Sequence, residues 1–185
     1  MKTKKTSNPK YPLVAVLDDG TELTIPRQSQ FDNEWLRKHG CSLMAEYVAL
    51  QFLGVHKWPI RLLEWHRANT PEDIFAKVTV KGVSKGIKHF GKGKGSAEYI
   101  ATPTAERIQS AIDEGAVVVL EQGNPIHTVT LLPDKKGIYC ANAGTVRKTT
   151  AEAKAKKATT SKRYRGMVIV RKKNSYDDTH QTNDD

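Results

Sequence analysis

Three polar residues, Cys41, His127 and Asn142, have the types and the chain order of a thiol nucleophile, its base and a partner for that base. A thiolate attacks carbonyl carbon readily, and an imidazole can take the proton from the thiol. An asparagine carbonyl can hold the imidazole in the tautomer that accepts this proton. The three side chains can act together only if the fold brings them to one place, so the elements that carry them must be considered next.

The segment that follows Cys41 predicts a helix. Apolar residues between positions 43 and 50 recur at the spacing of one buried helical face, and Gly54 is a natural C-terminal stop. A thiol at a helix N-terminus lies near unpaired N–H groups and the positive end of the helix dipole, which lower its pKa. The alternative is a buried and unreactive cysteine, the more common role for a lone residue of this type.

His127 and Asn142 lie on segments with strand character. An apolar run at 117–120 and a second run at 127–132 flank a Gly-Asn-Pro turn signal, and a third run at 137–142 follows a Pro-Asp-Lys-Lys turn. If the last two runs form a hairpin, its open end brings Asn142 back beside His127. The sequence therefore predicts that these two side chains meet.

On these elements the chain resembles the papain-like cysteine peptidases, and more closely the free-standing relatives of the peptidase domain that processes double-glycine bacteriocin precursors. In that group a glutamine follows a short strand, and a cysteine opens an apolar helix that closes with Leu-Gly. A later helix, a glycine and a strand then lead to the histidine and to an aspartate or asparagine. The matching features, which span about residues 22–146, are 25–30, Cys41, 52–54, 105–112, Gly115, 117–120, His127 and Asn142.

The resemblance implies an α+β fold of the papain-like type, in which an N-terminal helical part led by the nucleophile helix packs on an antiparallel β-sheet. It implies a peptidase that forms a thioester on Cys41, with His127 as general base and acid and Asn142 as its orienting partner. Gln30 would donate an N–H to the oxyanion, together with the backbone N–H of Cys41. Gln28 competes with Gln30 for this role, and the Ser29 between them favours Gln30. The implied partner is a peptide or protein substrate with small residues at the cleavage site.

Composition favours one domain in the 185-residue chain. We expect a flexible basic N-terminus at 1–10, a peptidase domain at 11–173 that contains a mobile basic insertion or surface helix at 147–164, and a disordered acidic tail at 174–185. A hairpin of 11–17 and 21–25 should lead to Gln30. The glycine-rich segment 86–93 is expected to be a flexible loop beside the active-site cleft.

We expect no cofactor and no metal, because none of the 6 histidines stands at zinc-ligand spacing. Cys140 lies within the third strand-like run and is expected to pack there, not to form a disulfide with Cys41. The absence of a signal-like apolar segment and of a membrane span predicts a cytoplasmic protein.

Three other functions stay open. The same residues can perform transpeptidation, or amide hydrolysis on a non-protein substrate such as a cell-wall peptide. Where the relatives have Gly-Pro after the cysteine, this chain has Ser42-Leu43, which leaves room for a catalytically degenerate, peptidase-like binding protein. The net charge of +10, concentrated in 77–94 and 147–173, leaves room for nucleic-acid binding, although no known nucleic-acid module accompanies it.

Overall fold

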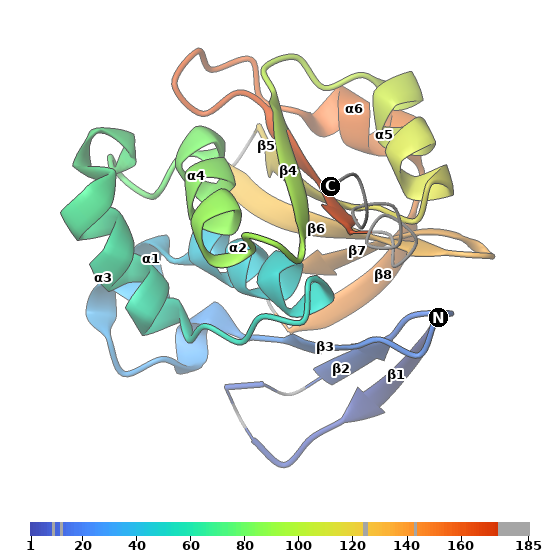
Figure 1. Ribbon diagram of the computed structural model, residues 1–185, viewed down its shortest axis with the longest axis horizontal. Helices are drawn as coiled ribbons and strands as arrows, with labels where there is room; N and C mark the ends of the chain where they lie inside the picture. The colour runs from blue at the N-terminus through green and yellow to red at the C-terminus, as the bar shows by residue number, and fades with distance from the viewer. Residues whose placement is uncertain (9, 12, 124–125, 143, 174–185) are drawn as a thin grey trace, which may run out of the picture.

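The computed structural model describes the whole chain except residues 9, 12, 124–125, 143 and 174–185, so the predicted tail lies outside the described residues. A six-stranded sheet with the order β4-β9-β5-β6-β7-β8 forms the centre, and β1-β2-β3 form a separate three-stranded sheet. Every strand pair is antiparallel. The mixed helix and antiparallel-sheet class expected from the sequence is thus confirmed (Figure 1).

The strands are β1 (Lys2–Lys5), β2 (Leu13–Val16), β3 (Glu22–Ile25), β4 (Gly95–Ile100), β5 (Val117–Gln122), β6 (His127–Asp134), β7 (Gly137–Asn142), β8 (Thr145–Thr149) and β9 (Met167–Lys172). The α-helices are α1 (Glu34–His39), α2 (Cys41–Phe52), α3 (Pro59–Asn69), α4 (Val80–Phe90), α5 (Ala105–Asp113) and α6 (Ala151–Lys157). Two short 3-10 helices are η1 (Gln28–Gln30) and η2 (Pro71–Asp73).

The central sheet separates two hydrophobic cores. Along β5, Val117 and Val119 pack with α2 and α4, whereas Val118 and Leu120 pack with α5. Because successive side chains of a strand point to opposite faces, a strand covered on both sides must be apolar throughout. Figure 1 shows the result, with α2, α3 and α4 on one side of the sheet and α5 and α6 on the other. Helix α2 lies between the sheet and α4, and every one of its residues is buried.

Two segments that were expected from the sequence to be flexible or mobile contain regular secondary structure, and at 147–164 it is the surface helix given there as the alternative. Lys2–Lys5, expected to be flexible, form β1 and pair with β2 in the register Lys2↔Val16 to Lys5↔Leu13. All four side chains are exposed, so backbone hydrogen bonding holds this strand, and lysines are well suited to a sheet edge. Within 147–164 the structure has the end of β8 and helix α6, whose N-cap Thr150 accepts from the Ala153 N–H.

The expected glycine-rich loop is also different, because residues 86–90 belong to helix α4. The helix begins at Thr79, whose hydroxyl accepts from the Gly82 N–H. A Cβ at Gly86 would overlap the Glu46 Oε1 atom of α2, so the absence of a side chain there lets α4 approach α2 closely. Glycine thus serves helix packing here, at a cost in helix propensity of about 1 kcal/mol relative to alanine.

A buried polar pair joins the helices on this side. His66 of α3 and Glu46 of α2 are both fully buried, with 2.8 Å between His66 Nε2 and Glu46 Oε2. The other ring nitrogen, Nδ1, lies 2.8 Å from the Thr70 hydroxyl. Burial raises the pKa of Glu46, and the contact with His66 opposes that rise. The stability of this core therefore depends on the buried carboxyl group of Glu46, which has His66 as its one close polar partner among the described residues.

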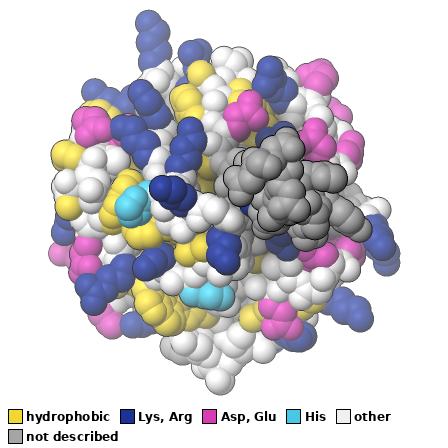
Figure 2. Space-filling model, in the orientation of Figure 1, with side chains coloured by type: hydrophobic (Ala, Val, Ile, Leu, Met, Phe, Trp, Pro, Cys, Tyr) yellow, Lys and Arg dark blue, Asp and Glu magenta, His cyan; other side chains and the backbone are white. Residues whose placement is uncertain are grey.

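Basic side chains are spread over the surface together with acidic ones, as Figure 2 shows for one face. Several are engaged in ion pairs, such as Lys85 with Glu72, Arg171 with Glu114 and Lys172 with Asp19. Among the described residues, no helix is both long and apolar enough to cross a membrane.

Candidate active site

Cys41 stands at the first position of α2, as the sequence predicts. Helix α1 ends at Gly40, which is also the N-cap of α2, and a Cβ at Gly40 would meet the Leu36 carbonyl oxygen at 2.5 Å. The close succession of two helices therefore requires a glycine immediately before the cysteine. The side chain of Cys41 is 8% exposed and lines a crevice between α2 and the sheet.

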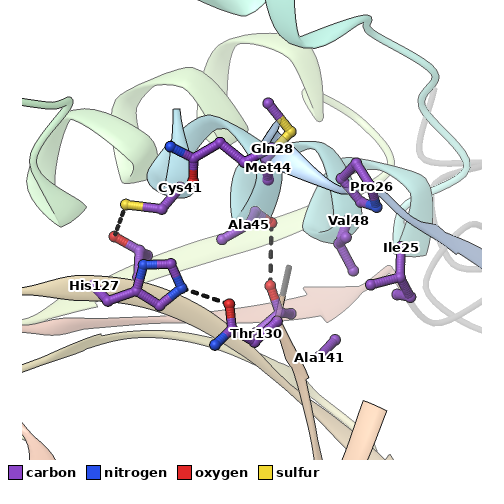
Figure 3. Close-up of a pocket in the computed structure, with 12 residues that line it drawn as sticks. Ile25, Pro26, Gln28, Cys41, Met44, Ala45, Val48, His127, Thr130 and Ala141 are labelled. Atoms are coloured by element: carbon purple, nitrogen blue, oxygen red, sulfur yellow. Dashed lines mark hydrogen bonds between the residues drawn. The ribbon is translucent and has the colours of Figure 1, made fainter. Parts of the chain in front are cut away.

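The β6-β7 hairpin forms as predicted and brings His127 and Asn142 together. Its register, Thr130↔Ala141 to Asp134↔Gly137, places the end of β7 beside the start of β6. His127 Nε2 is hydrogen-bonded to Asn142 Oδ1. A neutral imidazole that donates through Nε2 has Nδ1 free to accept a proton. The Cys41 Sγ atom lies 3.8 Å from the hydroxyl oxygen of Thr128, the residue next to His127. Figure 3 shows Cys41 and His127 facing one another from α2 and β6.

The pair shifts the pKa of both groups in the direction of ionisation. Burial raises the pKa of the Cys41 thiol, but the hydrogen bond to His127 and the positive charge of Lys77 outweigh burial, so the pKa lies below the ordinary value of 9.0. The hydrogen bond to Cys41 raises the pKa of His127, burial opposes it, and the bond to Asn142 adds to the rise. Both directions favour a thiolate-imidazolium pair at neutral pH.

The structure places Gln28 at the crevice, where the sequence analysis preferred Gln30. Gln28 lines the crevice beside Cys41 (Figure 3), and Gln30 is not among the lining residues. Both residues belong to η1, a tight 3-10 turn. Side chains two positions apart in such a turn point in different directions. The Gln28 Nε2 atom donates to the Arg37 carbonyl at 2.9 Å, which anchors the amide beside α2. The preference for Gln30 rested on the neighbouring serine, which does not determine the direction of a glutamine side chain.

A buried charged cluster next to Cys41 was not predicted. Lys77 Nζ lies 3.7 Å from Cys41 Sγ and 3.1 Å from Thr128 Oγ1, and it forms an ion pair with Glu121. One signal in the sequence pointed to it: Glu121 directly follows the apolar run of β5, where a carboxylate is buried only with a partner. The partner itself lies 44 residues away, beyond the reach of any local pattern.

The crevice beside these residues is mostly apolar. Its cavity volume is only about 20 Å³, far below that of a ligand pocket. Helix α2 contributes Met44, Ala45 and Val48, and the other lining residues include Ile25 and Ala141 (Figure 3). Cys41 therefore lies at a narrow crevice with small and apolar walls.

Comparison with known proteins gives a relationship of fold. No protein-family model matches the chain, and no curated protein matches it in sequence. Among the solved chains of similar structure is a crystal structure of a protein described as a C39-like peptidase from Bacillus anthracis. The TM-score is 0.55 and the sequence identity 12%, and the match covers 85% of this chain and 98% of that chain. At this identity the likeness shows a shared fold.

Proposed function

We propose that this protein is a papain-like cysteine peptidase related to the C39-like peptidases, with Cys41 as nucleophile. The observation that carries the proposal is that Cys41, at the start of α2, lines the same crevice as His127 and Asn142 of the β6-β7 hairpin (Figure 3). Within that crevice, His127 Nε2 is hydrogen-bonded to Asn142 Oδ1. The fold of the C39-like peptidase from Bacillus anthracis supports the same class.

In the proposed mechanism, these residues carry out peptide hydrolysis in the following steps. The Cys41 thiolate attacks the carbonyl carbon of the scissile bond, and the resulting oxyanion accepts hydrogen bonds from the Cys41 backbone N–H and from Gln28. Protonated His127 gives its proton to the leaving amine, the C–N bond breaks, and a thioester to Cys41 remains. Neutral His127 then takes a proton from water, which attacks the thioester and releases the acid.

Small residues at the scissile bond fit the crevice better than large ones. Its free space is limited and its walls are formed by Ala45, Val48 and Ala141. Each large side chain in a substrate would have to displace one of these buried walls or remain outside the crevice. Peptides with glycine or alanine at the cleavage site are therefore the first substrates to test.

The pH dependence of thiol alkylation tests the Cys-His pair without a known substrate. We expect iodoacetamide to modify Cys41 rapidly well below pH 9.0, because the pKa of its thiol is lowered in the folded protein. A Cys140→Ala background leaves Cys41 as the single thiol, since the chain has 2 cysteines. Alkylation that begins only near pH 9 in the folded protein would contradict the catalytic proposal and favour the peptidase-like binding protein.

Gln28→Ala should lower kcat/KM for a peptide substrate by about 10²- to 10³-fold, the usual effect of removing one oxyanion donor. Gln30→Ala is the matched control, because it makes the same change in the same turn outside the crevice. The rate of Cys41 alkylation should be nearly the same in both variants, since an oxyanion forms only with substrate. A larger loss in Gln30→Ala than in Gln28→Ala would reverse the assignment.

A further inference from the structure

The sulfur of Cys41 has a second cationic neighbour besides His127. Lys77 lies in the connection between η2 and α4, and its side chain is 6% exposed. Its Nζ atom is 3.7 Å from Cys41 Sγ, within hydrogen-bonding distance for sulfur. A buried lysine is rare unless its charge is paired, so the groups that contact Lys77 indicate the role of its ammonium.

The ammonium of Lys77 has three N–H donors, and the structure offers three acceptors. These are the Glu121 carboxylate, the Thr128 hydroxyl at 3.1 Å and the sulfur of Cys41. Thr128 in turn donates its O–H to Glu121 Oε2 at 2.8 Å, which fixes the direction of its lone pairs. The third donor of Lys77 is therefore aimed at the sulfur by the two polar partners that hold the other two.

Aromatic side chains cover the same ammonium from the outside. The ring centroid of Tyr164 is 5.6 Å from Lys77 Nζ, and the Tyr164 hydroxyl accepts from the Ala76 N–H at 3.2 Å. Phe75 packs edge-on against Tyr164. Because the Lys77 side chain is buried and the Ala76 N–H before it is held by Tyr164, its charge lies close to the sulfur and its field is screened little.

Charges alternate in sign along this cluster. From the inside outward, they are Glu121, Lys77, the Cys41 sulfur and His127. Tyr164, whose ring lies against Lys77, is a further titratable group beside them. If the sulfur were neutral, the imidazolium of His127 would face the ammonium of Lys77 with no anion between them. An anionic sulfur separates the two positive charges and interacts favourably with both.

We propose that Lys77, aimed by Glu121 and Thr128, is a second catalytic cation that holds the Cys41 sulfur as a thiolate whether or not His127 carries a proton. The inference rests on the proposed function, because it concerns the same nucleophile. Its consequence is a division of work, in which Lys77 stabilises the anion and His127 is free to transfer protons. In a Cys-His pair alone, the free thiolate loses its positive partner if the imidazole releases its proton to solvent before substrate binds.

Iodoacetamide alkylation across the pH range, in the Cys140→Ala background, separates the two cations. We compare that protein with His127→Ala, with Lys77→Met/Glu121→Gln, and with the variant that combines all three changes. Glu121→Gln accompanies Lys77→Met so that no unpaired carboxylate is buried, and its amide can still accept from Thr128. With His127→Ala alone, we expect alkylation near pH 7 to be at least about tenfold faster than in the combined variant, which corresponds to one pKa unit.

Glu121→Gln with Lys77 intact provides a second test that does not depend on whether the lysine can be removed. This substitution removes the negative charge of Glu121, which competes with the Cys41 sulfur for the ammonium of Lys77. The Cys41 thiolate should therefore form at lower pH, and its alkylation in weak acid should become faster. A lysine with only a structural role would give no change or a slower reaction. Circular dichroism of each variant checks that the fold is retained.

The outcomes distinguish this inference from the proposed function. If the parent protein has a reactive thiol but His127→Ala alone reduces it to ordinary reactivity, the Cys-His pair stands and the role of Lys77 is refuted. If the parent protein itself reacts as an ordinary thiol, both proposals fail. If His127→Ala keeps the thiolate and the combined variant loses it, Lys77 is its second partner.

Discussion

Cys41→Ala should abolish peptide hydrolysis, with a loss in kcat of at least about 10³-fold, because it removes the sulfur on which the acyl intermediate forms. His127→Ala should lower kcat by a similar factor, since both the attack on the carbonyl and the departure of the amine need its proton transfer. Effects of residues that act as one unit are not additive, so the double variant should be little worse than either single variant. Steady-state cleavage of glycine- and alanine-containing peptides measures all three.

Cys140→Ala is the matched control for this prediction. Cys140 is as buried as Cys41, with an exposed fraction of 8%, and Lys154 Nζ lies 3.0 Å from its sulfur. It stands in the middle of β7 and faces the core formed with α5 and α6, away from the crevice. Its replacement should leave kcat and KM within about twofold. Equal loss of activity in Cys41→Ala and Cys140→Ala would show that the assay reports folding and not a nucleophile.

His66→Ala should lower the free energy of unfolding by about 3–5 kcal/mol at neutral pH, the usual effect of removing one partner of a buried ionisable pair. The variant leaves the Glu46 carboxylate between α2, α3 and α4 without its closest partner, and Glu46 Oε1 already has none among the described residues. Urea denaturation followed by circular dichroism measures the change. His56→Ala, on an exposed side chain, should change stability by less than about 0.5 kcal/mol.

The effect of His66→Ala should depend on pH in a defined direction. Burial raises the pKa of Glu46 above 4.5 in the folded state, so its favourable contribution is fully present below pH 4.5 and is lost as pH rises through the folded pKa. The destabilised variant should therefore recover stability on acidification towards pH 4.5, because the buried carboxyl can then bind a proton. A loss that is the same at pH 4.5 and pH 7 would indicate a packing defect in place of an unpaired charge.

The sequence alone determined the elements that carry the candidate site. The apolar period after Cys41 predicts α2, and the two strand-like runs around the Pro-Asp-Lys-Lys turn predict the hairpin that joins His127 to Asn142; the helix and the hairpin both form. The predicted Gly-Asn-Pro turn includes positions 124–125, which lie outside the described residues. Such features are local, since helix periodicity, strand alternation and turn residues act over a few positions. A short hairpin also fixes its own register, and this register is enough to bring two side chains 15 residues apart into contact.

Only the tertiary structure decided which polar side chains surround the sulfur. Gln28 and Gln30 are the same residue type and lie on either side of Ser29, so the sequence does not distinguish them. The turn of η1 determines that Gln28 lines the crevice. Lys77 lies in a stretch of lysines that composition assigns to solvent, yet its partner Glu121 lies on a strand that the fold buries beside Cys41. The N-terminal lysines likewise form β1 through backbone pairing with β2, which the nature of their side chains does not predict. The physical reason is the same in each case: burial and long-range pairing depend on which surfaces meet, and local sequence carries no record of that.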